Sequence, residues 1–314
     1  MGVQEAGLPT CTAGEVKNRA DLLIYWGCNP MHSHPRQISR YSGFARGYFT
    51  ERGMKDRKMI VTDPRVTDTA KLADVHLQLK PNTDYELFSA LLVILRGKKP
   101  HPSVEEVTGI SIEQMEESVE LIKKSNYVMI YGGLGLPASK GSHRNIEMVL
   151  RLANEINKYT KCNVGALRGH CNVNGFNQIA SYMYGYPYGL DFSRGYPRYN
   201  PGEFTATDVL RDGEVDAVFL MAADLGAHLP RDCVKKINDI PMVCIDIAPG
   251  PSTTSADVVL PGVIDALECD ATFYRFDGLT QYVQPFTKSP FSFTINRREG
   301  SNDFNRWMRG EHYN

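Results

Sequence analysis

The stretch Asp21-Leu22-Leu23-Ile24-Tyr25-Trp26-Gly27 decides the fold, because it is a strand-length apolar run that opens on an acid, ends in glycine and occurs twice. Residues 216–226 repeat its pattern. In both places a second apolar run follows, at 60–63 and 243–246, and then a third segment, at 69–77 and 252–260. One numbering offset, 183, relates four matched pairs, Asp63 and Asp246, Ala73 and Ala256, Asp74 and Asp257, and Leu77 and Leu260. One register over so many positions predicts two similar α/β units, which would hold two similar ligands or two halves of one ligand.

Strand-length apolar runs alternate with helix-period segments along most of the chain, a pattern typical of βαβ units. We therefore predict an α/β fold with two pseudo-repeated, doubly wound parallel-sheet units. The expected parts are a first unit over residues 1–100, a middle α/β segment over 101–205, a second unit over 206–294 and an irregular tail over 295–314. The expected strands are 22–26, 59–62, 75–79, 127–131, 215–221, 242–245 and 258–260, and the expected helices include 84–95, 111–124, 145–159 and 231–238.

Composition excludes several classes of protein. A chain of 314 residues with 42% hydrophobic content can bury more than one core. Lys+Arg 35 against Asp+Glu 36 gives a net charge of -1, which disfavours a nucleic-acid partner. No apolar run is as long as a membrane span and the start does not resemble a signal peptide, so we expect a cytoplasmic protein. The 7 cysteines form no C-x-x-C pair, which argues against a zinc ribbon or an iron–sulfur cluster and favours reduced thiols.

Glycines and acids stand where the predicted strands end. In open parallel sheets this is the edge at which ligands bind. Any one of these motifs could be only a tight turn between a strand and a helix, but four in one chain favour a nucleotide site. The G-x-G-x-x-G fingerprint is absent, which disfavours a plain NAD enzyme. The motifs are Gly27-Cys28-Asn29-Pro30, Gly132-Gly133-Leu134-Gly135, Asp224-Leu225-Gly226, and the strand-end acids Asp63 and Asp246.

Several longer strings resemble the molybdopterin oxidoreductase (dimethyl-sulfoxide reductase) superfamily. Arg168-Gly169-His170-Cys171-Asn172-Val173-Asn174-Gly175 is similar to the R-G-x-x-N-V-x-G stretch of formate dehydrogenases. The resemblance is stronger to the B-subunit family of formylmethanofuran dehydrogenases, and covers about residues 3 to 294. The strings that carry it include Trp26-Gly27-Cys28-Asn29-Pro30-Met31-His32-Ser33-His34-Pro35-Arg36, Pro81-Asn82-Thr83-Asp84, Lys140-Gly141-Ser142-His143-Arg144-Asn145 and Arg198-Tyr199-Asn200-Pro201-Gly202-Glu203.

The resemblance implies a cofactor and the residues that hold it. The cofactor is a tungsten or molybdenum ion between two pyranopterin guanine dinucleotides, that is, bis-molybdopterin guanine dinucleotide, which explains the repeat. Arg168 and His170 would be catalytic. The planar Arg168 guanidinium would orient carbon dioxide or formate through a bidentate interaction. The first dinucleotide would contact Gly27, Asn29, Asp63 and Asp84, and the Asp84 carboxylate is suited to binding guanine. The second dinucleotide would contact Gly226, His228, Asp246 and Asp257. The remaining cofactor contacts would be Gly133, Gly135 and Asn172.

Members of the family also have parts for which this sequence shows no counterpart. A four-cysteine 4Fe–4S site and a cysteine or selenocysteine that ligates the metal would precede Met1, so no metal ligand is assigned to this chain. We expect Met1 to be an internal start in a longer protein, created by a UGA selenocysteine codon read as a stop. A frameshift and a split subunit are the alternatives. An amphipathic helix would replace the patternless end beyond Arg297.

The activity implied by the resemblance is reversible two-electron reduction of carbon dioxide to formate in methanogenesis. A partner amidohydrolase subunit would then join formate to methanofuran, and iron–sulfur subunits would deliver electrons from ferredoxin. Two alternatives stay open: a formate dehydrogenase alpha-type subunit, and a non-catalytic, cofactor-binding subunit without a metal ligand.

Overall fold

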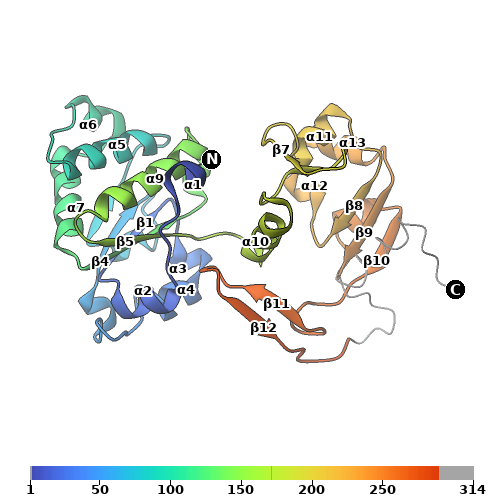
Figure 1. Cartoon of the computed structure of the whole chain (residues 1–314), viewed down its shortest axis with the longest axis horizontal. Coiled ribbons are helices and arrows are strands. Elements are labelled where there is room, and N and C mark those ends of the chain that lie inside the picture. Colours follow the sequence, from blue (N-terminus) through green and yellow to red (C-terminus); the bar gives the residue numbers. More distant parts are fainter. Residues whose placement is uncertain (1, 171, 290–314) are drawn as a thin grey trace. The chain divides into compact units, whose positions relative to one another are not determined.

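The computed structural model describes residues 2–170 and 172–289, which form two compact units (Figure 1). Of these described residues, unit 1 comprises 2–170 together with 276–279, and unit 2 comprises 172–275 together with 280–289. No helix in the described residues combines the length and the apolar character that crossing a membrane requires.

Unit 1 is built on a five-stranded parallel sheet in the order β3-β2-β1-β4-β5. The chain winds outward from β1 to β3 and then returns to place β4 on the other side of β1. This reversal puts the topological switch point between β1 and β4, where open α/β sheets bind their ligands. The strands are β1 (Leu22–Trp26), β2 (Lys58–Thr62), β3 (Val75–Leu77), β4 (Tyr127–Gly132) and β5 (Lys161–Ala166).

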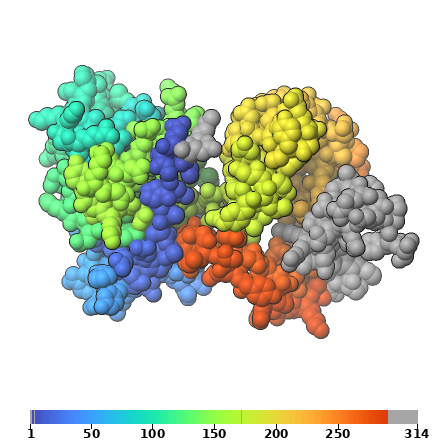
Figure 2. Space-filling view, in the orientation of Figure 1, coloured from blue at the N-terminus to red at the C-terminus, as the bar shows by residue number. Residues whose placement is uncertain are grey.

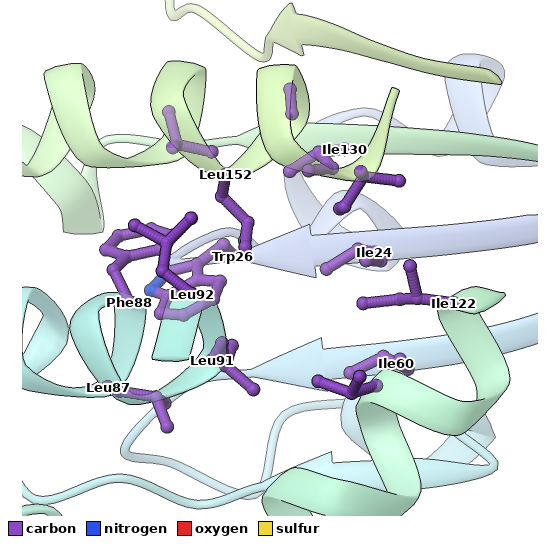
Figure 3. Close-up of a cluster of buried hydrophobic side chains, with 14 of the residues drawn as sticks. Ile24, Trp26, Ile60, Leu87, Phe88, Leu91, Leu92, Ile122, Ile130 and Leu152 are labelled. Carbon is purple, nitrogen blue, oxygen red and sulfur yellow. The ribbon is translucent and has the colours of Figure 1, made fainter. Parts of the chain in front are cut away.

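Helices cover both faces of this sheet, because alternate residues of its strands are apolar on each side. On one face, side chains of α5, α7 and α9 pack with those of β1 and β4 in a core where Trp26 stacks on Phe88 at 3.8 Å (Figure 3). On the other, Val16 of α2 and Ile38 of α4 pack against β1 and β4. The helices of unit 1 are α1 (Gly2–Ala6), α2 (Ala13–Arg19), α3 (Pro30–Ser33), α4 (Pro35–Arg40), α5 (Asp84–Leu95), α6 (Ser103–Thr108), α7 (Ile112–Lys124), α8 (Gly135–Ala138) and α9 (His143–Ile156), with short 3₁₀ turns η1 (Gly53–Asp56) and η2 (Ala70–Leu72).

Unit 2 contains a smaller parallel sheet in the order β10-β9-β8, with two antiparallel pairs beside it. Leu210 of α11 and Cys233 of α13 pack with the strands in its core. The strands are β6 (Leu190–Asp191), β7 (Arg198–Tyr199), β8 (Val218–Met221), β9 (Met242–Asp246), β10 (Val258–Pro261), β11 (Ala271–Tyr274) and β12 (Thr280–Val283). The helices are α10 (Val173–Tyr184), α11 (Ala206–Asp212), α12 (Leu225–His228), α13 (Arg231–Ile237) and α14 (Pro251–Ser255).

The two parallel sheets pair their strands in the same register. Ile60 of β2 pairs with Val75 of β3, and Val243 of β9 pairs with Val258 of β10, so both members of the pair are shifted by the same offset of 183. The first strands are related by a larger offset of 195, since Leu23 pairs with Met59 and Val218 pairs with Met242. The chain between the first and second strands is therefore shorter in unit 2, by the difference between these two offsets.

The parallel α/β architecture predicted from the sequence is confirmed, but the division of the chain is different. Residue 100 is not a boundary, because β4 and β5 return to complete the sheet that β1 began. The boundary falls between residues 171 and 172 instead of at 205. The expected strand 215–221 begins only at Val218, and the predicted tail 295–314 lies outside the described residues.

Candidate functional site

The carboxyl edge of the unit 1 sheet gathers most of the residues that the sequence singled out. Gly27 and Asn29 follow β1, Asp63 follows β2, Gly133 follows β4 and Arg168 follows β5. Because all five strands are parallel, these positions lie along one edge of one sheet. They flank the switch point between β1 and β4.

At this switch point two glycine turns pack against each other. Gly27 has a φ of 61°, and its carbonyl oxygen accepts a hydrogen bond from the amide of Gly135 at 3.0 Å. A Cβ on Gly133 would come within 2.3 Å of the Cys28 Cβ and 2.5 Å of the Gly27 oxygen, and one on Gly135 within 2.7 Å of the Gly27 Cα. Glycine is therefore required at 133 and 135 by contact between the two turns, whether or not a ligand is present.

Asn29 ties the β1 turn to the segment that precedes η2. Its Oδ1 accepts hydrogen bonds from the Thr69 hydroxyl at 2.7 Å and the Thr69 amide at 3.3 Å. The Thr69 hydroxyl oxygen in turn accepts from the amide of Met31 at 3.2 Å. The pair Asn29–Thr69, which we name the unit 1 clasp, fixes the turn after β1 to the crossover between β2 and β3.

The two carboxylates of unit 1 at this edge are already hydrogen-bonded. Asp63 is only 2% exposed, and its Oδ1 accepts from the backbone amide of Arg65 at 2.9 Å. Asp84 accepts from the Trp26 indole at 2.7 Å on one oxygen and from the Ser139 hydroxyl at 2.5 Å on the other. The guanine contact assigned to Asp84 stays a prediction, and the observed contacts anchor the start of α5 to the ends of β1 and α8.

The Cys28 side chain, which lies inside the β1 turn, is buried. Burial raises the pKa of the Cys28 thiol to about 12, and the Asp63 carboxylate contributes in the same direction. The thiol is therefore protonated at neutral pH, which suits a core side chain and not a nucleophile.

Arg168 lies just beyond β5 with its side chain exposed. The amide of the preceding Leu167 donates to the Gly132 oxygen at 2.9 Å, which continues the β4–β5 pairing to the last residue before the arginine. The Arg168 carbonyl oxygen lies 3.0 Å from His34 Nε2. His170, two positions on, is exposed and has a φ of 64°. The backbone at Arg168 is thus held at the edge while its side chain is left exposed.

Unit 2 reproduces the clasp at the end of its own first strand. The Asp224 Oδ1 accepts from the Ser252 hydroxyl at 2.9 Å, and the Ser252 oxygen accepts from the Leu225 amide at 2.9 Å. Asp224 is related to Asn29 by the offset of 195 that relates the first strands, and Ser252 is related to Thr69 by the offset of 183. We name Asp224–Ser252 the unit 2 clasp. Sequence reasoning missed both clasps, although the offset of 183 would have paired Thr69 with Ser252.

The structural counterpart of Gly27 is Ala222 and not Gly226. The Gly27 amide donates to the Thr62 oxygen, and the Ala222 amide donates to the Ile245 oxygen, both at 2.9 Å. Both residues have a left-handed backbone, with a φ of 46° at Ala222. Gly226 lies within α12, so the match of Gly27 with Gly226 made from the sequence was out of register. His228 ends the same helix, with its Nδ1 2.6 Å from the Asp224 carbonyl oxygen.

The two acids assigned to the second dinucleotide lie at opposite edges of the unit 2 sheet. Asp246 ends β9 at the carboxyl edge, where its Oδ1 accepts from the Ile247 amide at 2.7 Å. Asp257 accepts from the amide of Met242, the first residue of β9, at 2.8 Å. Asp74 makes the same contact with Met59 at 2.8 Å in unit 1. Asp257 therefore starts a strand at the amino edge, and we do not include it in the site.

Asn172 belongs to unit 2, where its side chain is bound to β11. Its Oδ1 accepts from the Tyr274 amide at 2.8 Å and its Nδ2 donates to the Thr272 oxygen at 3.3 Å. It also lines a mostly apolar pocket of about 650 Å³ in unit 2, whose aromatic residues are Phe176, Tyr184, Tyr188, Phe192 and Tyr274. Asn172 thus shapes an apolar hollow and holds the start of α10 to the hairpin.

Within residues 2–170 and 172–289, no group of three or more histidine, cysteine, aspartate or glutamate side chains could hold a metal ion. The site in the described part therefore offers backbone turns, hydrogen-bonding side chains and two exposed arginines, Arg168 and the Arg65 that pairs with Asp63.

Comparison with known proteins identifies a family and several relatives. The model of the molybdopterin oxidoreductase family matches residues 4–293. The chain is 50% identical over 279 residues to the B subunit of the tungsten-containing formylmethanofuran dehydrogenase 2 of Methanocaldococcus jannaschii, covering 89% of this chain and 64% of the relative. It is 47% identical over 290 residues to the protein of the same name from Methanococcus maripaludis, covering 92% of this chain and 66% of the relative. The chain thus spans just under two thirds of the length of these curated relatives.

The solved formyltransferase/hydrolase complex from Methylorubrum extorquens, in complex with methylofuran, contains a chain with a similar fold. The TM-score is 0.71 at 15% identity, and the match covers 92% of this chain and 75% of the other.

Proposed function

Because the chain belongs to the molybdopterin oxidoreductase family, we propose that it binds a molybdopterin cofactor with tungsten or molybdenum as part of a formylmethanofuran dehydrogenase B subunit. The observation that carries the proposal is the repeated clasp, Asn29–Thr69 and Asp224–Ser252, at equivalent strand ends of two parallel sheets. Identities of 47–50% to B subunits of this enzyme over about nine tenths of the chain support the same assignment.

We infer that each clasped turn holds one guanine dinucleotide of a bis-molybdopterin cofactor, so that the two units are structural repeats with one ligand half each. The residues fit such a group. Gly27, Gly133 and Gly135 pack without side chains between them, so a ligand at the switch point would meet backbone rather than side chains. Beside Arg168, an added Cβ on Gly169 meets nothing within 4 Å, which leaves room for a bound molecule.

The cofactor supplies the two-electron chemistry, and the protein supplies binding, orientation and electrostatics. Arg168 is permanently charged and presents a planar fork of donors, so it can hold a carboxylate or carbon dioxide in one orientation. Its exposed guanidinium follows β5 directly, a position from which it can reach a molecule bound at the carboxyl edge. The reaction that we propose is the reversible reduction of carbon dioxide to formate.

The proposal also includes partner subunits of the same enzyme complex. An amidohydrolase subunit would join formate to methanofuran, and iron–sulfur subunits would supply low-potential electrons from ferredoxin, with a 4Fe–4S cluster bound outside residues 1–314. The relatives are named as one subunit of a dehydrogenase, which supports an assembly of several chains.

The test is to purify the natural subunit with its companions under anoxic conditions. We expect tungsten or molybdenum bound, with guanine nucleotide released by acid hydrolysis, and formate oxidation by the assembled complex. A folded, assembled protein that contains neither metal nor guanine nucleotide contradicts the proposal.

A further inference from the structure

A segment of unit 1 between α4 and β2 exposes an unusual set of large apolar side chains. Tyr48 is 76% exposed and Phe49 is 64% exposed, with Phe44 and Met54 exposed on the same segment. We name residues 40–55 the arginine–aromatic loop; its light-blue atoms lie on the outer surface of unit 1 in Figure 2. None of these side chains takes part in the carboxyl-edge site described above.

The same loop is rich in cations. Arg40, Arg46, Arg52 and Lys55 are all exposed, against one exposed acid, Glu51. Arg52 is paired with Asp56, whereas Arg40, Arg46 and Lys55 have no ion-pair partner in the part of the chain that the structure describes. The loop is therefore a local basic patch on a chain whose net charge is -1.

The buried guanidinium of Arg57 anchors the loop through hydrogen bonds, and Arg57 is only 6% exposed. Its Nε donates to the Ala20 oxygen at 2.9 Å, its Nη1 to the oxygens of Ser42 and Ala45, and its Nη2 to the Lys17 oxygen and the Thr50 hydroxyl at 2.6 and 2.7 Å. These five acceptors match the five N–H donors of an arginine. Three of them, at 42, 45 and 50, belong to the loop, so the loop is fixed before any partner arrives.

Contacts with α2 fix the aromatic tip as well. The Tyr48 amide donates to the Asn18 side chain at 3.1 Å, and the Phe49 amide donates to the Asn18 oxygen at 2.9 Å. The Arg19 guanidinium lies 5.6 Å from the centre of the Phe49 ring. The Tyr48 and Phe49 rings also pack edge-to-face, with centroids 4.8 Å apart, so the exposed rings are presented in one arrangement.

We propose that the arginine–aromatic loop is the docking surface for an acidic face of a companion protein subunit. Tyrosine, phenylalanine, methionine and arginine are the residues enriched at protein interfaces, and a fixed loop loses little conformational freedom on binding. The unpaired Arg40, Arg46 and Lys55 select an acidic partner by charge complementarity. The inference rests on the proposed function, because it supposes that this chain is one subunit of an assembly.

A protein partner fits better than a nucleic acid or an anionic membrane. The most exposed of its large apolar side chains are the aromatic Tyr48 and Phe49, and the unpaired cations, three in number, are few for a surface that tracks phosphates.

The experiment compares two double charge reversals in the full-length subunit, co-expressed with all of its companion subunits. Arg46→Glu/Lys55→Glu reverses the patch, and Lys98→Glu/Lys99→Glu makes the same change at two exposed lysines elsewhere on unit 1. Size-exclusion chromatography with light scattering measures the fraction of the subunit that is assembled, and circular dichroism reports folding. We expect at least a tenfold loss of assembly for Arg46→Glu/Lys55→Glu, unchanged folding, and normal assembly for the lysine control. Tyr48→Ala should weaken assembly without changing the charge.

Normal assembly of a folded Arg46→Glu/Lys55→Glu variant overturns the docking proposal. So does a variant that assembles normally but loses binding to duplex DNA or to phosphatidylserine vesicles, since the occupant would then be a nucleic acid or a membrane. Cofactor content is measured separately. A wild-type complex that assembles through the loop but holds no cofactor would contradict the proposed function and leave the docking surface standing.

Discussion

The turn after β1 in unit 1 and the turn after β8 in unit 2 have the same backbone plan and different chemistry. Each begins on a left-handed residue, Gly27 or Ala222, and each is clasped to a hydroxyl in the next crossover. In unit 1 the clasp acceptor is the neutral amide of Asn29, and the glycine turn after β4 packs directly on the β1 turn. In unit 2 the acceptor is the Asp224 carboxylate, and the described sheet has three strands with no counterpart of β4.

Two units can thus share the same strand register while different contacts stabilise the equivalent turns. The unit 1 turn is supported by close packing of glycines, so its clasp is one support among several. The unit 2 turn depends more on Asp224 and Ser252, whose hydrogen bond involves a charged acceptor and is therefore stronger. The two cofactor halves that we propose would meet turns of similar shape but different charge.

The largest effect should come from substituting Arg168. This residue has no counterpart in unit 2, because it follows β5 and the described part of unit 2 has no equivalent strand. Arg168→Lys in the intact subunit keeps the charge and loses the planar fork. We expect normal metal content and a loss of formate oxidation of about 10²–10³-fold, as for the removal of one donor to a developing charge. Steady-state kinetics measure it, and near-normal activity would remove Arg168 from the site.

The packing of unit 1 predicts the next effect. Gly133→Ala places a methyl group against Cys28 and the Gly27 oxygen, so the turns must separate. We expect a loss of about 1–3 kcal/mol of unfolding free energy, the usual cost of overpacking. Gly169→Ala, where an added Cβ meets nothing within 4 Å, is the matched control and should be close to neutral in the same thermal or denaturant unfolding measurement. Equal stability of the two variants would show that the glycine contact does not matter.

The sequence predicted much of this architecture, and its failures have physical causes. Apolar runs placed the parallel strands, and the offset of 183 correctly anticipated the register of Ile60–Val75 and Val243–Val258. The helix expected over 111–124 begins at Ile112, and Ser111 and Gln114 form a capping box at its start. The boundary at residue 100 was wrong because pairing between β1 and β4 is a long-range contact that leaves no local signal.

The site was less predictable than the fold. Ala222 was missed because an alanine gives no hint of its left-handed backbone, whereas Gly27 does. Asp257 was misplaced because a repeated aspartate can belong to either end of a strand until the strand pairing is known. Thr69 and Ser252 were missed because each acts through a side chain distant in sequence.

The clasps should differ in strength. Ser252→Ala removes a donor to a carboxylate, which costs about 1.5–3 kcal/mol, whereas Thr69→Val removes a donor to a neutral amide, which costs about 0.5–1.5 kcal/mol. We therefore expect Ser252→Ala to lower guanine nucleotide content more than Thr69→Val, with both proteins folded. Acid release and chromatographic quantification of the nucleotide measure the difference. A larger loss of nucleotide in Thr69→Val than in Ser252→Ala would show that the unit 1 turn, and not the unit 2 turn, depends more on its clasp.

The smallest effects should come from the two aspartates at the amino edges of the sheets. Asp74→Ala removes an acceptor for the Met59 amide together with an exposed ion pair to Lys58, and Asp257→Ala removes an acceptor for the Met242 amide. Each should cost about 1 kcal/mol of stability and leave nucleotide content unchanged. Unfolding by urea gives the first quantity and nucleotide release the second. A selective loss of nucleotide in Asp257→Ala would return that residue to the cofactor site.

If one guanine dinucleotide binds at each clasped turn, an experimental structure of the cofactor-loaded subunit will show both. We expect density for one dinucleotide at the carboxyl edge beside Gly27–Asn29, and for a second beside Ala222–Asp224. Density at the amino edge near Asp74 or Asp257, or a single dinucleotide that contacts only one of the two turns, would contradict this assignment.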